Sequence, residues 1–273
     1  MGQGLYTKIR GIAMRELGVG ADAVRVMRTQ TDKVPNTSAT AASSGSDLNG
    51  QAVRAACETL RERLAPIAAE LLGAEAATAL PASAVIFEDG FARAPQVPGV
   101  KVPFERVVDR AYMKQVPLSA TGYYRTPGIG YDKAKGKGRP FYYFAYGAAV
   151  TEVEVDGYSG MKRVLRVDIL HDVGESLNPG VDRGQIEGGF VQGMGWLTGE
   201  ELRWSAQGKL LTHSASTYQI PAIGDAPAAF HVELLPNAAQ PGVIHGSKAV
   251  GEPPLMLAIC VREAIRVAIA AFG

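Results

Sequence analysis

Four segments rich in glycine and other small residues are spread along the chain, and they constrain its fold more than any other feature. Each carries polar residues beside the small ones, and at least three lead into a predicted helix. They are GQGLYTK at 2–8, TAASSGSDLNGQAV at 40–53, GQIEGGFVQG at 184–193 and GSKAVGEPP at 246–254. Small side chains let backbone N–H groups approach an anionic ligand, and a helix N-terminus favours negative charge. The pattern predicts a phosphorylated or otherwise anionic cofactor held by several loops.

The segments differ from the common phosphate-binding motifs. The chain has no GxxxxGK[ST] loop and no GxGxxG turn between a strand and a helix. The 28 Lys and Arg residues are balanced by 27 Asp and Glu, and the net charge of +1 gives no reason to expect nucleic acid or a membrane surface as a partner. The basic stretch 133–139 is therefore expected to be an exposed loop, and no stretch is apolar over the length needed to span a bilayer.

Cysteine usage argues against a disulfide framework or a metal cluster ligated by protein side chains. Cys57 and Cys260 lie far apart and show no ligand spacing. We expect both to be small buried side chains. A reducing compartment, the cytoplasm, is the expected location, and no N-terminal signal segment is visible.

Hydrophobic periodicity predicts the helices. We expect them over 5–17, from Asp47 or Asn49 to Leu71, over 103–115, over 182–196, and from Pro253 to the C-terminus. Pro66 should kink or split the second of these. Each glycine inside 182–196 costs a helix about 1 kcal/mol, so the glycines there need a packing or ligand reason.

Alternating apolar residues predict strands over 24–29, over 142–170 with a turn at 157–160, and over parts of 202–235. VIFEDGFAR predicts a hairpin that turns at Asp89 and Gly90, and 119–140 is expected to be a long loop. Because the cofactor segments are scattered among helices and strands, we expect an α+β fold of two intertwined α/β subdomains with mixed sheets.

Glu252 is the ionisable residue that most strongly indicates chemistry. It lies between Gly251 and Pro253 at the start of an apolar helix, whose dipole stabilises a carboxylate. Burial beside a cofactor would instead raise its pKa, and such a balance suits a general base. A plain helix-capping acid is the alternative. Lys248, nearby, is expected either beside a substrate or phosphate group or in solvent.

At this point five longer strings show a specific resemblance. They are GQGLYTK, VPNTSATAASSGSDLNGQAV, ATGYYRTPGIGY, DVGESLNPGVDRGQIEGGFVQGMG and SKAVGEPPLMLA, in this order. Together they resemble the molybdopterin-binding half of the xanthine dehydrogenase and aldehyde oxidase family, over essentially the whole chain. The resemblance implies a molybdopterin-binding domain of that type, in which the pterin dithiolene holds the molybdenum and no protein metal ligand is needed.

The resemblance also implies residue roles. Glu252 would be the catalytic base, and Ala42 would lie nearest the molybdenum. The residues implied to bind the cofactor are Gln3, Thr40, Ala41, Ala42, Ser43, Ser46, Gln185 and Gly251.

The implied reaction is the oxidative hydroxylation of hypoxanthine and xanthine to urate. Electrons would pass to 2Fe-2S clusters, FAD and NAD on partner subunits or domains, and the full enzyme would be a dimer of heterodimers. An aldehyde or other N-heterocycle oxidase of the same family, and a non-catalytic fragment, remain as alternatives.

The family pattern places MGQG in the middle of the molybdenum unit. We therefore interpret residues 1–273 as its C-terminal portion, with the upstream part of the subunit absent. Either Met1 is an artificial or misassigned start in a longer subunit, or the gene is split and the missing N-terminal half is a separate chain. The residues that select the substrate would lie upstream.

Overall fold

The computed structural model describes residues 3–33, 40–41 and 43–272. It divides into two compact units, Met1–Tyr142 (unit 1) and Tyr143–Gly273 (unit 2). Each unit is one continuous stretch of chain with its own apolar core.

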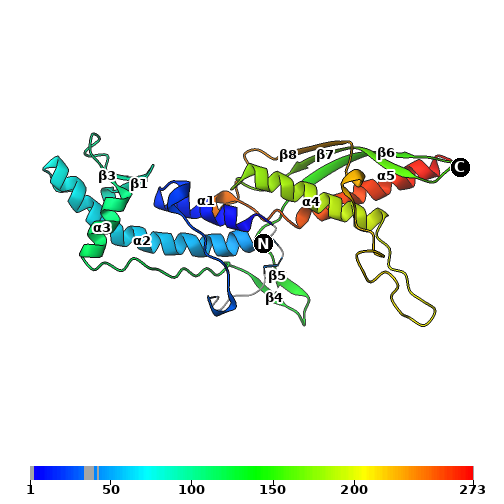
Figure 1. The fold of residues 1–273 in the computed structure, drawn as a ribbon, viewed down its shortest axis with the longest axis horizontal. Coiled ribbons are helices and arrows are strands. Elements are labelled where there is room, and N and C mark those ends of the chain that lie inside the picture. The colour runs from blue at the N-terminus through cyan, green and yellow to red at the C-terminus, as the bar shows by residue number, and fades with distance from the viewer. Residues whose placement is uncertain (1–2, 34–39, 42, 273) are drawn as a thin grey trace. The chain divides into compact units, whose positions relative to one another are not determined.

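Unit 1 is built on two helices that run side by side in the same direction. They are α1, Leu5–Leu17, and α2, Gly45–Ala76. Leu5 approaches Gly45 at one end of the pair, and Glu16 meets arginines further along α2 (Figure 1). The expected helix 5–17 is confirmed, and α2 continues through Pro66 without the expected split.

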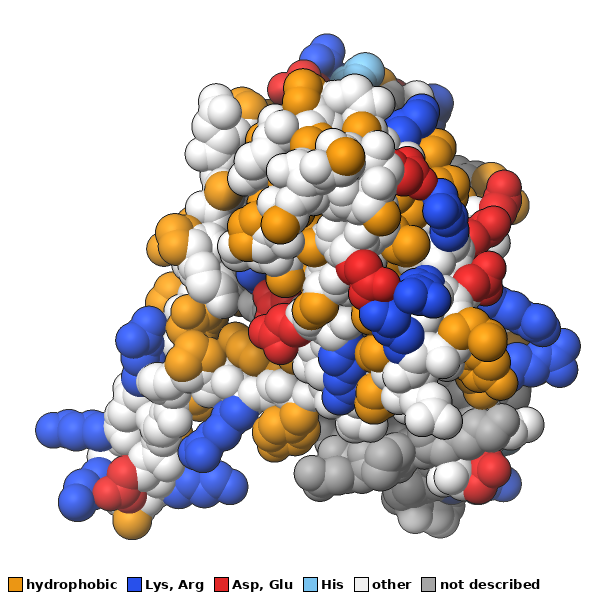
Figure 2. Space-filling view, turned by 90° about the vertical axis from the view of Figure 1, so that its left-hand side faces the viewer, with side chains coloured by type: hydrophobic (Ala, Val, Ile, Leu, Met, Phe, Trp, Pro, Cys, Tyr) orange, Lys and Arg blue, Asp and Glu red, His pale blue; other side chains and the backbone are white. Residues whose placement is uncertain are grey.

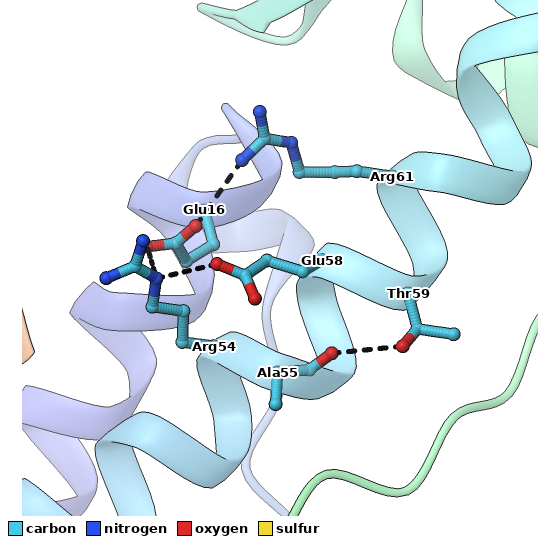
Figure 3. A network of polar contacts seen from close by, with 6 residues as sticks. All are labelled: Glu16, Arg54, Ala55, Glu58, Thr59 and Arg61. Atoms are coloured by element: carbon cyan, nitrogen blue, oxygen red, sulfur yellow. Dashed lines mark hydrogen bonds and ion pairs between the residues drawn. The ribbon is translucent and has the colours of Figure 1, made fainter.

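A charged network joins these two helices. The Glu16 side chain is only 8% exposed, and its carboxylate lies 3.8 Å from Arg54 Nε and 3.4 Å from Arg61 Nη1 (Figure 3). Arg54 Nε also donates a hydrogen bond of 2.8 Å to Glu58. The two arginines remain partly exposed, so water screens the network.

A small antiparallel sheet and a third helix complete the core of unit 1. The sheet contains β1, Ile86–Glu88, β2, Phe91–Arg93, and β3, Lys101–Pro103, and the helix is α3, Phe104–Met113. The expected hairpin is confirmed, because Asp89 and Gly90 both have positive φ, as a tight two-residue turn requires. Phe87, Val102 and Val107 pack there against α2.

The segment expected to be a long loop contains a second hairpin. Its strands are β4, Gly130–Asp132, and β5, Lys137–Arg139, and all six residues are exposed. Asp132 Oδ1 closes the turn by accepting hydrogen bonds from Ala134 N and Lys135 N. Figure 2 shows Lys and Arg side chains gathered on a projection at its lower left, where this hairpin lies. The basic stretch is thus exposed, as expected, but part of it forms an antiparallel hairpin and not a loop.

Unit 2 contains a mixed sheet covered on one face by helices. Strand β6, Gly147–Val155, is antiparallel to β7, Lys162–His171, and β7 is parallel to β8, Ala229–Leu234. Helices α4, Pro179–Thr198, and α5, Ile259–Ala270, supply the buried side chains that cover it (Figure 1). With unit 1, this confirms an α+β fold with a mixed sheet.

Three further expectations differ from the structure. No described residue of 24–29 is in a strand, and within 202–235 only β8 and an isolated bridge between Trp204 and Leu210 form. The C-terminal helix begins as a 3-10 helix, η6, Pro253–Ala258, and becomes α-helical only from Ile259. The other short 3-10 turns are η1, Ala21–Ala23, η2, Thr31–Lys33, η3, Ala82–Ala84, η4, Ile223–Asp225, and η5, Ile244–Gly246.

Both cysteines are free. Cys57 is buried in α2, and burial raises the pKa of its thiol to about 11, with Glu16 adding to the shift. Cys260 is half-buried, and its Sγ lies 2.8 Å from Thr151 Oγ1. Within the described part of the chain, no helix has the length and apolar character to cross a membrane.

Candidate cofactor site

Two of the small-residue segments meet at the paired helix starts of unit 1. A Cβ added to Gly45, the first residue of α2, would lie 3.0 Å from Leu5 Cδ2 and 3.1 Å from Thr40 Cγ2. Gly45 therefore lets the start of α1 lie close to the start of α2, with the Thr40 side chain beside Gly45. Gln3 lies two residues before Leu5 and is exposed.

Neither helix start is capped by a side chain. Gly4, the N-cap of α1, has φ 66° and no side chain to offer. Ser44, the N-cap of α2, donates its hydroxyl to Ala41 O at 2.8 Å and accepts no bond from the helix. Among the described residues, neither N-cap side chain accepts a hydrogen bond from the first N–H groups of its helix. Two such ends side by side form a favourable environment for an anionic group.

The other predicted residues of unit 1 lie along this turn. Ser43 has φ 53°, a left-handed conformation uncommon for a residue other than glycine. Ser46 is buried in the first turn of α2, and Ala41 is exposed. Ala42, predicted to lie nearest the metal, falls outside the described residues. The described residues of this segment therefore gather at one helix end, as predicted.

In unit 2, helix α4 packs closely on the segment that carries Glu252. A Cβ added to Gly189 would lie 3.0 Å from Gly251 O, and one added to Gly193 would lie 2.2 Å from Leu255 O. Close packing therefore explains why glycine occupies these two positions inside a helix. Gln185 lies one turn before Gly189, on the face of α4 that packs against Gly251.

Glu252 is the N-cap of η6, at the helix start where the sequence placed it. Its side chain is exposed and makes no capping hydrogen bond, while its carbonyl accepts a bond of 3.1 Å from Leu255 N. The alternative of a plain capping acid therefore receives no support from the geometry. The carboxylate faces solvent.

Sequence reasoning missed a buried ion pair beside this segment. The Lys248 ammonium group donates a hydrogen bond to the Asp172 carboxylate, and the two side chains are 6% and 5% exposed. Lys248 Nζ also donates to Phe144 O at 3.0 Å. The expectation of a solvated Lys248 was wrong, because its side chain is buried and its ammonium group pairs with Asp172. Nothing in the local sequence pairs Asp172 with Lys248, since the contact spans 76 positions.

The residues of unit 1 fit an anionic cofactor. The donor set at the paired helix starts consists of backbone N–H groups and hydroxyls, which suit phosphate and a polar ring system. Among the described residues, no group of three or more His, Cys, Asp or Glu side chains is placed to hold a metal ion. A metal at this position would depend on ligands that the cofactor itself brings.

Comparison with known proteins agrees with this chemistry. Residues 1–227 match the family described as the molybdopterin cofactor-binding domain. The chain therefore belongs to the molybdopterin cofactor-binding family, as a molybdenum-binding region of the xanthine dehydrogenase type. Glu252 lies beyond the matched residues.

Individual relatives agree on the type of enzyme. The chain is 45% identical over 269 residues to the xanthine dehydrogenase/oxidase of Gallus gallus. The aligned region covers 98% of this chain and 18% of that protein. Quinoline 2-oxidoreductase from Pseudomonas putida 86 has a TM-score of 0.82 and 28% identity, over 99% of this chain and 33% of that one. The aldehyde oxidoreductase from Desulfovibrio desulfuricans has a TM-score of 0.70 and 25% identity, over 95% of this chain and 24% of that one. The chain thus spans about a fifth of the length of the curated relatives it matches.

Proposed function

We propose that this chain is the part of a xanthine dehydrogenase-type molybdenum hydroxylase that holds the cofactor and supplies the catalytic base. The observation that carries the proposal is the 45% identity to a xanthine dehydrogenase/oxidase along 98% of the chain. Glu252, exposed at the start of η6 and free of capping bonds, is the carboxylate suited to the role.

The proposed cofactor contacts follow the two clusters. In unit 1, backbone N–H groups at the starts of α1 and α2 would bind the anionic part of the cofactor, with Gln3 beside them. The contacts proposed there are Gln3, Thr40, Ala41, Ala42, Ser43 and Ser46. In unit 2, the proposed contacts are Gln185 and the Gly251 backbone, where the lack of a Cβ allows close approach of a ligand.

The chemistry divides between cofactor and protein. When bound, the molybdenum centre supplies an electrophile that accepts two electrons from the substrate. The carboxylate of Glu252 would take the proton from the oxygen nucleophile as that oxygen attacks an electron-poor carbon of the purine. A positioned general base contributes about 10²–10⁴-fold to the rate. The close packing of Gly189 of α4 on Gly251 O would help to hold this base in one position.

The whole enzyme would need further parts. We propose that the missing N-terminal half of the molybdenum subunit contributes the residues that select hypoxanthine and xanthine. Electrons would leave through 2Fe-2S clusters and FAD to NAD on partner subunits or domains, in a cytoplasmic dimer of heterodimers. The family resemblance supports these partners, and the relatives are about five times as long as this chain.

A second candidate is an aldehyde or N-heterocycle oxidase of the same family. The TM-score of 0.82 to a quinoline oxidoreductase favours it, but the identity of 28% is well below the 45% to xanthine dehydrogenase/oxidase. Turnover of xanthine, quinoline and a simple aldehyde by the assembled enzyme separates the two. Preference for xanthine supports the first candidate, and preference for either other substrate supports the second.

The role of Glu252 is tested by Glu252→Gln in the assembled enzyme, with Glu233→Gln, an exposed residue of β8, as the matched control. We expect xanthine turnover per bound molybdenum to fall by about 10²–10⁴-fold in Glu252→Gln and to stay unchanged in Glu233→Gln. Molybdenum content should be equal in both. Loss of molybdenum from Glu252→Gln would show a structural role instead.

A further inference from the structure

The segment that carries Glu252 is held at both ends. On either side of Glu252, Gly251 and Leu255 pack on Gly189 and Gly193 of α4. At the N-terminal end of the segment, Lys248 N donates to Val173 O at 2.8 Å, and an isolated bridge pairs Gly174 with Ser247.

Side chains reinforce the N-terminal anchor. Lys248 Nζ binds the Asp172 carboxylate and Phe144 O, and Asp172 Oδ1 accepts a bond of 2.9 Å from Gly174 N. The ammonium group also lies 5.4 Å from the ring centroid of Tyr146. A fully paired, desolvated charge of this kind fixes one geometry, because any other arrangement would leave a charge buried without a partner.

Tyr143 adds a hydrogen bond to the stretch between Lys248 and Glu252. Its hydroxyl oxygen accepts a hydrogen bond of 2.7 Å from Ala249 N, three residues before Glu252. Its ring centroid lies 6.0 Å from Lys248 Nζ, so the same residue contacts the ion pair and the backbone beyond it. Tyr143 therefore links the buried pair to the segment that leads to Glu252.

We propose that Tyr143, Lys248 and Asp172 form an anchor that positions Glu252 for proton transfer. The inference rests on the proposed function of Glu252 as the base. Lys248 and Asp172 are positioning residues, since the Lys248 ammonium group is neutralised by Asp172 and has no charge to offer a substrate. Misplacement of a catalytic group by about 1 Å can lower a rate by about 10²-fold, so an anchor three residues away has a measurable effect.

The test compares Tyr143→Phe with Tyr146→Phe in the assembled, molybdenum-loaded enzyme. Both changes remove one hydroxyl, but only that of Tyr143 accepts the Ala249 N–H, and Tyr146 is exposed. Two quantities are measured: hydrogen–deuterium exchange of a peptide covering 246–254, and kcat and KM for xanthine per bound molybdenum. We expect Tyr143→Phe to speed exchange of this peptide by about 10-fold and to lower kcat by about 10-fold, with KM little changed. Tyr146→Phe should resemble the wild type in both.

A second pair tests the ion pair without relying on tyrosine. Asp172→Asn weakens the buried pair, while Asp168→Asn weakens the exposed pair with Arg166 on the same strand. Faster exchange and lower kcat are expected only for Asp172→Asn. Unchanged exchange in Tyr143→Phe and Asp172→Asn, or faster exchange with unchanged kcat, would overturn the proposal. A wild-type enzyme that binds molybdenum but hydroxylates nothing would instead refute the proposed function. In that case the exchange data would still test whether Tyr143 and Asp172 hold the segment 246–254 in place.

Discussion

Glu16 in unit 1 and Asp172 in unit 2 both pair with basic side chains, but water reaches only one of the two networks. The arginines around Glu16 are more than 40% exposed (Figure 3), whereas Lys248 beside Asp172 is 6% exposed. The exposed network joins two long helices that already share an extended contact. The buried pair holds a loop that has little secondary structure of its own. The difference indicates that buried charge is used here where a loop must keep one geometry.

The largest expected effect separates the two networks directly. Lys248→Met leaves the Asp172 charge buried without its partner, which should lower the free energy of unfolding by about 3–5 kcal/mol. Arg61→Met removes one exposed partner of Glu16 and should lower it by about 0–1 kcal/mol, since Arg54 remains. Thermal unfolding of the two variants measures the difference. Equal, small shifts would mean that the buried pair contributes no more than a surface pair.

A smaller effect compares glycines in the helices of the two units. Gly193→Ala places a Cβ 2.2 Å from Leu255 O, so η6 must shift, and we expect a loss of about 1–3 kcal/mol. Gly11→Ala in α1 meets nothing within 4 Å and should gain about 0.5–1 kcal/mol from helix propensity. Unfolding midpoints of the pair give the comparison. Stabilisation by Gly193→Ala would show that α4 and η6 pack less closely than described.

The smallest effect is a pH dependence in unit 2. Burial lowers the pKa of His171 below its usual 6.5; the Lys248 charge lowers it further, and the Asp172 charge opposes both. The folded protein thus keeps a neutral imidazole, while the unfolded chain takes up a proton below about pH 6.5. The stability that His171 contributes is therefore present above that pH and is lost as the pH falls toward the lowered value.

His171→Gln should make stability less dependent on pH between about 7 and 5. The matched control is His231→Gln, an exposed residue of β8 in the same sheet. Unfolding midpoints across this pH range provide the measurement. An equal slope in the wild type and His171→Gln would exclude His171 as the source of acid sensitivity.

Sequence reasoning was most successful where one segment determines its own structure. The periodic helix 5–17, the Asp89-Gly90 hairpin and the glycine-rich helix α4 were all predicted and are confirmed. Each depends on local periodicity or on turn residues that require positive φ. The sequence also predicted that the small polar run at 40–46 leads into a helix N-terminus, which is the start of α2, but the meeting of this start with that of α1 was not predicted.

The failures involve contacts between distant segments. Residues 24–29 alternate like a strand, but no described segment pairs with them, and a strand needs a partner. The β4–β5 hairpin was missed because glycines and lysines give no alternating apolar signal. The Lys248–Asp172 pair was missed because no local sequence pattern indicates that a lysine and an aspartate 76 positions apart are in contact.

The central claim is that this chain holds a molybdenum cofactor as one part of a larger xanthine dehydrogenase-type enzyme. The most direct test measures molybdenum and pterin content after purifying the chain alone and after co-expression with its neighbouring subunits. The account predicts stoichiometric molybdenum and pterin in the co-expressed complex, with xanthine-dependent reduction of NAD. Absence of molybdenum and pterin from both preparations would contradict it.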